Sequence, residues 1–338
     1  MSKILCMMSG GVDSNVCAYL LQQQGHEVVG VTLSLWWQDG DNTCCGVAAN
    51  CRALSVCEKL GIEHFALNKR SDFMKYVVDP YVESHKVGET PSPCLNCNTH
   101  VKIGGMIKYA DFLDCEYIAT GHYIRKDADG LYVAKDLTKD QTYMLSRVQA
   151  DVIPRFMFPL GNLLKEEVRA IAEANQIVAP KDSQDLCFVQ NEDRSEFLAE
   201  RGVNFDPGQI VNLDGKIVGE HNGTCNYTVG QRRGLPGGSS EKLFVIRINK
   251  DKNQVIVGSD ESLMSDECFA RDFNWIYKPD NNEIEVKIRY KAELVHGRFY
   301  IVDDMVRVVF DKPQRSVTPG QGAVLYSNGR LLGGGWIV

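Results

Sequence analysis

The hexapeptide Ser-Gly-Gly-Val-Asp-Ser, residues 9–14, constrains this chain more than any other feature. It stands between an apolar, strand-like run over residues 3–8 and a helical pattern over residues 14–24 that ends at Gly25. Consecutive glycines allow a sharp turn that brings backbone N–H groups close to an anion, and the following helix start adds its positive dipole end. The pattern predicts a phosphate-binding loop, although it is neither a Walker A nor a dinucleotide-binding glycine motif.

The rest of the first half alternates strand-like and helical patterns. Further strand-like runs cover residues 28–35, 64–67 and 117–120, and a helical pattern between the first two ends at Gly61. This alternation predicts a doubly wound parallel sheet with helices on both faces. Another helix is expected over residues 164–175.

The pattern of apolar residues changes after about residue 190, where short β-like runs separated by Gly, Pro and Asp turns replace the helical patterns. Such runs predict a small barrel or sandwich. We therefore expect an α/β catalytic domain over residues 1–190, a small β-rich central domain over 191–260 and a C-terminal β-barrel over 261–338.

Charge and cysteine content narrow the class of protein. The net charge is −7, so any contact with nucleic acid must use a local basic patch. No apolar stretch approaches the ~18 residues of a membrane span, and residues 3–8 are expected to form a strand rather than a secretory signal. The 12 cysteines then predict a cytoplasmic protein without a disulfide framework. Three of them, Cys6, Cys17 and Cys57, lie in apolar patterns and are predicted to be small core residues.

Two further segments contain cysteines that could react. Cys94 and Cys97 stand in Pro-Cys-Leu-Asn-Cys-Asn, residues 93–98, and Cys187 stands in Asp-Leu-Cys-Phe, residues 185–188. A single CxxC is weak evidence for zinc, because a zinc ribbon needs a second pair. By itself, Cys187 would more often be a core cysteine than a nucleophile.

Taken with the glycine loop, these segments resemble the tRNA-specific 2-thiouridylases, the MnmA/TrmU family of PP-loop ATP pyrophosphatases. The resemblance extends over essentially the whole chain and includes residues 119–123, 139–143, 227–235, 318–321 and 333–336. It implies an adenine nucleotide alpha hydrolase-like fold and an ATP-dependent sulfurtransferase. In that reaction the uracil O2 of the wobble uridine of tRNA is adenylated, sulfur replaces it, and AMP and pyrophosphate are released.

The resemblance also implies roles for individual residues. Cys187 would carry a persulfide, and Cys97 would be the partner thiol, so that a transient Cys97–Cys187 disulfide follows sulfur transfer. Cys94 stays open as a spare thiol, a backup nucleophile or a metal ligand. Asp13 would bind the Mg²⁺ that accompanies ATP, or cap the first helix. The expected ATP-binding residues are Met7, Met8, Ser9, Gly10, Gly11, Val12, Asp13, Ser14, Leu33 and Gly121.

The expected partners are the anticodon arm of tRNA and a persulfide donor such as a cysteine desulfurase or a sulfur-relay protein. Lys287, Arg289 and Lys291 alternate with apolar residues, which predicts three cations on one face of a strand over residues 284–290 and beyond. Arg232 and Arg233 could extend this patch. The expected tRNA-binding residues are Asn98, His122, Lys139, Asp140, Gln141, Arg289, Tyr290 and Gln321.

Three alternatives remain open from the sequence. Cys94, Cys97 and Cys187 could hold an iron–sulfur cluster that delivers sulfide, since three cysteines leave one open cluster site. A PP-loop synthetase acting on a small molecule would leave the cysteine pair without a role. A non-catalytic tRNA-binding module would not need the intact glycine loop.

Overall fold

The computed structural model describes residues 1–36, 47–177, 186–189, 194–235 and 242–338. The chain divides into two compact units. The first unit contains residues 1–77, 94–191 and 329–331, and the second contains residues 78–93, 192–328 and 332–338. Across the described ranges, no helix has both the length and the apolar character needed to cross a membrane.

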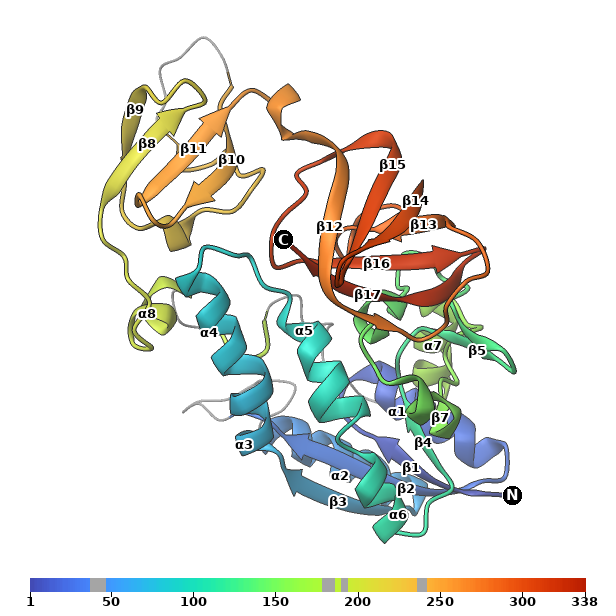
Figure 1. Ribbon diagram of the computed structural model, residues 1–338. Coiled ribbons are helices and arrows are strands. Elements are labelled where there is room, and N and C mark those ends of the chain that lie inside the picture. The colour runs from blue at the N-terminus through green and yellow to red at the C-terminus, as the bar shows by residue number, and fades with distance from the viewer. Residues whose placement is uncertain (37–46, 178–185, 190–193, 236–241) are drawn as a thin grey trace. The chain divides into compact units, whose positions relative to one another are not determined.

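The first unit is built on a five-stranded sheet. Its strand order places β3 (Glu63–Asn68) at one edge, followed by β2 (Glu27–Ser34), β1 (Lys3–Met7), β4 (Tyr117–Thr120) and β7 (Phe156–Met157). Every neighbouring pair in this sheet is parallel, and Figure 1 shows β1, β2 and β3 side by side. The prediction of a parallel α/β sheet is confirmed.

Three helices form where the periodicity predicted them. They are α1 (Val12–Gln23), α2 (Val47–Leu60) and α7 (Lys165–Ala174). Ala53 of α2 and Val168 of α7 are completely buried in the core of this unit. The remaining elements of this part of the chain are α3 (Arg70–Phe73), η1 (Met74–Val78), α5 (Pro93–Asn96), η2 (Cys97–Ile103), α6 (Ile107–Phe112), β5 (Arg125–Asp127), β6 (Gly130–Tyr132), η3 (Thr142–Leu145) and η4 (Ala150–Arg155).

The second unit contains a small four-stranded sheet, as expected for the central part of the chain. Its order is β10 (Phe244–Asn249), β11 (Gln254–Gly258), β8 (Gly208–Asn212) and β9 (Ile217–His221). The apolar residues of these strands, together with Tyr227, form a separate small core. This unit also contains α4 (Asp79–Lys86), η5 (Thr224–Asn226), η6 (Glu261–Leu263) and α8 (Arg194–Ala199).

A six-stranded antiparallel barrel completes the chain. Its strands run in the order β12-β15-β14-β13-β16-β17, and a further pairing of β12 with β17 closes it. The sequence did not predict β12, because acidic and basic residues interrupt its apolar positions; its ladders to β15 and β17 hold it in place. The bounds are β12 (Met264–Trp275), β13 (Glu283–Lys287), β14 (Val295–Val302), β15 (Met305–Arg315), β16 (Gly322–Ser327) and β17 (Arg330–Ile337).

The predicted row of three cations on one strand face is wrong. β13 ends at Lys287, where its ladder with β16 also stops, so Arg289 and Lys291 lie beyond the strand. The chain turns there, with the Ala292 N–H donating to the Arg289 carbonyl over 3.1 Å. The Arg289 guanidinium donates to the backbone carbonyls of Arg315 and Ser316, so it is engaged within its own unit.

Candidate active site

The loop between β1 and α1 is organised by the Ser14 hydroxyl. That hydroxyl accepts from the Ser9 N–H at 3.0 Å and donates to the Gly11 carbonyl at 3.0 Å. Gly11 is the N-cap residue of α1, and no side chain caps the helix. Because the first N–H groups of a helix have no intrahelical acceptor, this end is suited to bind an anion.

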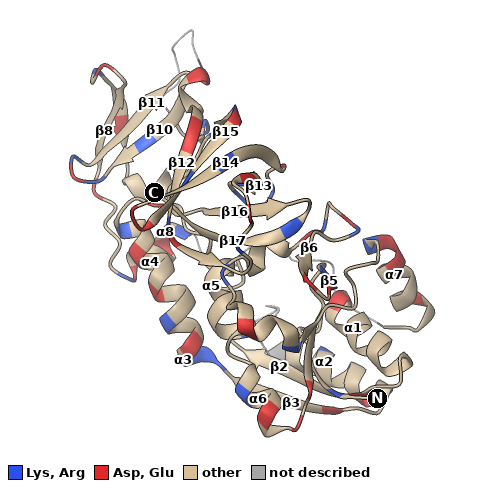
Figure 2. Ribbon diagram, turned by 45° about the vertical axis from the view of Figure 1, so that its right-hand side comes forward, with Lys and Arg blue, Asp and Glu red and all other residues tan. Residues whose placement is uncertain are grey.

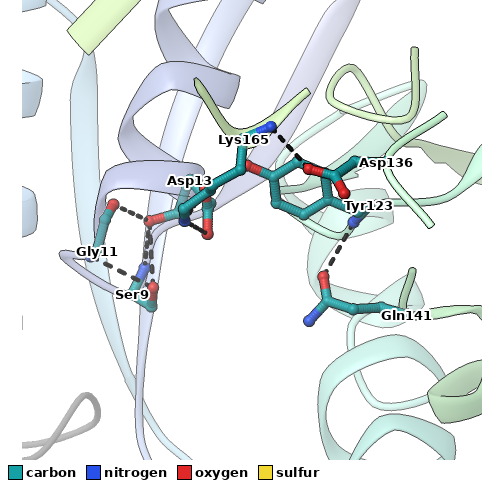
Figure 3. A network of polar contacts seen from close by, with 8 residues as sticks. Ser9, Gly11, Asp13, Tyr123, Asp136, Gln141 and Lys165 are labelled. Carbon is teal, nitrogen blue, oxygen red and sulfur yellow. Dashed lines mark hydrogen bonds and ion pairs between the residues drawn. The ribbon is translucent and has the colours of Figure 1, made fainter. Parts of the chain in front are cut away.

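Asp13, in the first turn of α1, is held by two residues from distant parts of the chain (Figure 3). Lys165 donates to both carboxylate oxygens at 2.8 Å, and the Tyr123 hydroxyl donates at 2.8 Å. Lys165 is itself positioned by its backbone N–H, which donates to Asp136 at 3.0 Å. The alternative that Asp13 caps the helix is therefore wrong, because its carboxylate is directed to this pair instead.

Two glycines allow the close approach of backbone segments around the loop. Gly10 has φ +69°, and a Cβ there would lie 2.5 Å from the Ala49 carbonyl oxygen of α2. Gly121 follows β4, and a Cβ there would lie 2.8 Å from the backbone of Asp13 and Ser14. A side chain at either position would push these segments apart.

A cavity of about 210 Å³ opens beside the loop. Its floor comes from neighbouring strands, because Met7 pairs with both Val31 and Thr120 in the sheet. The wall from β2 is apolar, whereas the loop and the segment after β4 contribute polar groups. The lining residues are Met7, Met8, Ser9, Asp13, Ser14, Val31, Leu33, Leu35, Lys102, Thr120, Gly121, His122 and Gln141.

The cavity thus unites most of the residues expected to bind ATP and two expected to contact tRNA. His122 is half-buried, and its Nδ1 lies 2.7 Å from the Thr120 hydroxyl. Burial, together with the positive charge of Lys102, lowers the pKa of His122 to about 3, so its imidazole is neutral at pH 7. Gln141 is fixed by the Tyr123 N–H, which donates to its Oε1 at 2.9 Å.

The cysteines of the two candidate segments differ in environment. Cys97 begins the π-helix η2 and is 6% exposed, whereas Cys94 is exposed. Cys187 is half-buried and adjacent to Phe188. The centroid of the Phe188 ring lies 5.7 Å from that of Phe73 and 6.2 Å from that of Trp36. Trp36 directly follows Leu35 of the cavity wall, so Phe188 fixes Cys187 near this end of β2. The residues just before Leu186 lie outside the described part of the chain, and the pairing of Cys97 with Cys187 stays a prediction.

Other residues expected to bind tRNA have contacts within their own unit. Asn98 is buried and donates to the Cys94 carbonyl at 2.9 Å. Asp140 is buried and accepts from the Ala134 N–H and from Thr142, while Lys139 is half-buried. In the second unit, Gln321 donates to a backbone carbonyl at 2.7 Å, and Tyr290 is half-buried. Their contacts with tRNA stay predictions.

Among the described residues, no group of three His, Cys, Asp or Glu side chains is placed to hold a metal ion. The Asp13 carboxylate accepts from Lys165 and Tyr123, and its role as a Mg²⁺ ligand stays a prediction. We therefore derive no step through protein-bound Mg²⁺ or through an iron–sulfur cluster.

Sequence reasoning missed several residues of the site, in the cavity lining and beside it. Lys165 is 152 residues from Asp13, and no local pattern connects the two. Lys102 is visible in the sequence as a cation of the helix expected after Cys97, but no pattern assigns it to the cavity. Val31, Leu35 and Thr120 could have been inferred from their positions at the ends of neighbouring parallel strands.

Three family models match the chain in succession. A tRNA methyl transferase HUP domain matches residues 2–191, a tRNA methyl transferase PRC-barrel domain matches 195–259, and an aminomethyltransferase beta-barrel domain matches 265–337. Among solved structures, the U34-tRNA thiolase NcsA from Methanococcus maripaludis aligns with a TM-score of 0.38 and 18% identity, covering 59% of this chain and 62% of that chain. A structural similarity this weak supports no conclusion about the present chain.

Curated relatives match over their full length. The tRNA-specific 2-thiouridylase MnmA of Natranaerobius thermophilus is 41% identical, and the alignment covers 100% of this chain and 97% of the relative. The protein of the same name from Trichlorobacter lovleyi is 40% identical, with 100% and 98% covered. The family models mention methyl transfer, but the full-length identity spans all three matched segments at once and is the stronger finding. The chain belongs to the MnmA family of tRNA-specific 2-thiouridylases.

Proposed function

We propose that this protein uses ATP to replace the O2 oxygen of the wobble uridine of tRNA with sulfur. The cavity beside the loop supports this proposal most directly, because it joins a loop suited to bind an anion to an apolar wall. Full-length relatives that are named tRNA-specific 2-thiouridylases give the substrate class.

ATP would bind with its phosphates at the loop and its adenine against the strand wall. Gly10, Gly11 and Val12 would present backbone N–H groups, with the hydroxyls of Ser9 and Ser14 beside them. Leu33 is 7% exposed and lines the apolar side, where a planar base would pack. Mg²⁺, when bound to the phosphates, would neutralise part of their charge.

The chemistry would proceed in two stages. The uracil O2 attacks the α-phosphorus of ATP, and pyrophosphate leaves with the electrons of the broken P–O bond. The terminal sulfur of a Cys187 persulfide then attacks C2, and AMP departs with the C2–O2 electrons. Finally, the Cys97 thiolate attacks the Cys187 sulfur, which leaves sulfur on the base and forms a Cys97–Cys187 disulfide.

The substrate would need to leave its stack to reach the cavity, at a cost of a few kcal/mol. Asn98 and His122 would meet the flipped base, and Lys139, Asp140 and Gln141 would meet the anticodon arm nearby. Arg289, Tyr290 and Gln321 would contact the tRNA from the second unit. A persulfide-donating protein, such as a cysteine desulfurase, would reload Cys187 after the disulfide is reduced.

The alternatives fit less well. An iron–sulfur thiolase would need Cys94, Cys97 and Cys187 to converge, and no such metal-ligand group occurs among the described residues. A synthetase for a small molecule would not account for the full-length match to tRNA-modifying relatives.

The test follows sulfur transfer in cysteine variants. Cys187→Ser should abolish 2-thiouridine formation while tRNA-dependent pyrophosphate release survives, because adenylation precedes sulfur delivery. Cys97→Ser should also make no 2-thiouridine but should retain a persulfide on Cys187. Mass spectrometry of the tRNA nucleosides and of the protein measures both outcomes.

Cys94→Ser is the matched control, because its thiol lies three residues before Cys97 in the same segment and is exposed. It should keep at least part of the activity. Normal thiolation by Cys187→Ser or Cys97→Ser would overturn the assignment of these cysteines. Loss of thiolation in Cys94→Ser together with loss of bound iron would favour the cluster instead.

A further inference from the structure

Two lysine–tyrosine pairs lie on the first unit, outside the cavity. The Lys75 ammonium lies 4.8 Å from the centre of the Tyr76 ring, and the Lys108 ammonium lies 5.2 Å from the centre of the Tyr109 ring. Both lysines are exposed, and among the described carboxylates none lies within ion-pair distance of either. The two ammonium groups can therefore contact an anion in solution.

Lys69 joins the two pairs into one surface. Its ammonium is buried, donates to Asp72 at 2.6 Å and lies 4.8 Å from the centre of the same Tyr109 ring. The bond from Lys69 lowers the pKa of the Asp72 carboxyl, and the charges of Lys108 and Lys75 lower it further. Three lysines thus surround a single carboxylate, which makes this region locally basic in a chain whose net charge is −7.

A stacked pair of rings completes the surface. The His100 imidazole stacks on the Tyr76 ring, with the centroids 4.7 Å apart and the planes inclined by 20°. Tyr76 is half-buried, whereas His100 is exposed, so the imidazole is the outer member of the stack. The basic-aromatic surface, as we define it, consists of Lys69, Lys75, Tyr76, His100, Lys108 and Tyr109.

The helices that carry this surface also position the candidate cysteines. Element η2 begins at Cys97, and His100 is its fourth residue. The last residue of α3 is the buried Phe73, whose ring centroid lies 5.7 Å from that of Phe188, the neighbour of Cys187. Elements α3 and η2 are in contact within the first unit. A nucleotide that reaches these cysteines therefore leaves its neighbours in the RNA strand beside the basic-aromatic surface.

We propose that the basic-aromatic surface binds unpaired nucleotides of the substrate tRNA next to the target uridine, with a base stacked on His100 and phosphates on Lys75 and Lys108. This inference rests on the function proposed above. Unpaired RNA presents a flat base and a phosphate at every nucleotide, and proteins bind such strands by combining aromatic rings with cations. The exposed, stacked imidazole favours RNA over an acidic protein, which would use the lysines alone.

The experiment measures RNA binding by four variants of the full-length chain. His100→Ala removes the exposed ring, and His100→Phe restores a flat ring. Lys75→Ala/Lys108→Ala removes two charges, and Lys216→Ala/Lys252→Ala removes the same number from exposed turns of the central sheet as a control. Filter binding at several salt concentrations compares unmodified tRNA with a blunt RNA duplex that has the same number of phosphates. Thermal unfolding checks that each variant is folded.

The variants should separate stacking from charge. His100→Ala should bind the tRNA roughly 5- to 100-fold more weakly, the usual loss for one stacked base, and should bind the duplex as the wild type does. His100→Phe should recover most of the affinity for tRNA. Lys75→Ala/Lys108→Ala should reduce the slope of log affinity against log salt by about one to two units, and the control double variant should leave the slope unchanged.

Two results overturn the inference. One is a His100→Ala protein that binds tRNA within twofold of the wild-type affinity, and the other is a Lys75→Ala/Lys108→Ala protein with the wild-type slope. Normal tRNA binding by these variants, combined with slower loading of Cys187 by a cysteine desulfurase, would assign the surface to a protein partner instead. If His100→Ala melts at a lower temperature than the wild type, the two exposed lysines decide.

The two levels of proposal fail differently. A wild-type protein that thiolates tRNA, with surface variants that bind tRNA equally well, contradicts only the role of the basic-aromatic surface. A wild-type protein that neither binds tRNA nor thiolates it contradicts the proposed function, and the role of the surface with it.

Discussion

At the scale of single residues, burial decides which ionisable groups can react. Cys6 and Cys17 are completely buried, with their sulfur atoms 3.8 Å apart, and Cys57 lies in the same core. Burial raises the pKa of Cys57 to about 12, and the contact with Cys17 and burial raise that of Cys6. The raised pKa values keep the Cys6 and Cys57 thiols protonated at neutral pH. The complete burial of all three cysteines confirms the prediction that they are core residues.

His85 of α4 gives a prediction at this scale. Burial, with the nearby charges of Arg194 and Lys250, lowers the pKa of His85 to about 4, below its usual value near 6.5. Between these values the unfolded chain binds more protons than the folded one, so stability falls as the pH is lowered through this window. Urea unfolding from pH 7 to pH 4 should show a loss of roughly 3 kcal/mol from this residue.

The variant His85→Gln should flatten that dependence, because it removes the group that titrates. His296→Gln is the control, since His296 is exposed on β14. An equal pH dependence in His85→Gln and the wild type would contradict the assignment.

At the scale of elements, the loop between β1 and α1 contains two glycines that the fold requires to different degrees. Gly10 has a positive φ, and the Ala49 carbonyl occupies the place of its Cβ, so the fold itself requires glycine there. Gly11 has φ −88° and ψ 162°, an ordinary extended conformation, and its Cβ would meet only the Ser9 hydroxyl at 3.4 Å. The second glycine is therefore free of a structural requirement and available for a ligand.

These two positions should respond differently to the same substitution. Gly10→Ala should lower the free energy of unfolding by more than about 1 kcal/mol, because the left-handed backbone and the contact with α2 both oppose a side chain. Gly11→Val should fold normally and lose ATP binding, because its side chain occupies the space where phosphate approaches the backbone. Thermal unfolding and calorimetric titration with ATP measure the two effects.

Two results would contradict these expectations. A Gly11→Val protein that binds ATP with wild-type affinity would show that the loop is only a turn. A Gly10→Ala protein of wild-type stability would show that α2 can shift to make room for the added methyl group.

At the scale of the whole molecule, the charge is unfavourable for binding RNA. The net charge is −7, and Lys and Arg are interspersed with Asp and Glu along the described ribbon in both units (Figure 2). Affinity for tRNA must then come from a few well-placed cations. Arg289 donates to the Arg315 and Ser316 carbonyls, and two further cations lie close to it in sequence: Lys287 at the end of β13 and Lys291 beyond that strand.

Removing both lysines should weaken the salt dependence of tRNA binding. If each neutralises about one phosphate, Lys287→Ala/Lys291→Ala should reduce the slope of log affinity against log salt by about one to two units. Affinity for ATP should stay unchanged. Filter binding at several salt concentrations measures the slope.

The double variant Lys216→Ala/Lys252→Ala removes the same charge from exposed turns of the central sheet and should leave the slope as it is in the wild type. An unchanged slope in the first variant would place the tRNA surface elsewhere, around Lys139 or around Arg232 and Arg233.

The sequence by itself determined the strands β1 to β4 of the parallel sheet, the helices α1, α2 and α7, and the loop that begins α1, but not the short edge strand β7. These features depend on short-range patterns, namely alternation, the 3.6-residue period and glycines at a strand-to-helix turn, and such patterns are visible in a single chain. It also placed the short strands of the second half, but not β12. Charged residues interrupt the apolar positions of β12, so the strand is identified only by its pairing with β15 and β17.

Only the tertiary structure decided the charges of the candidate site. It paired Asp13 with Lys165, placed Lys102 in the cavity through a π-helix, and ended β13 before Arg289. Each of these depends on contacts between segments far apart in the chain, or on where a ladder stops. Electrostatic interactions fall off with distance and depend on burial, so the state of a charged side chain is set by neighbours that the linear sequence does not identify.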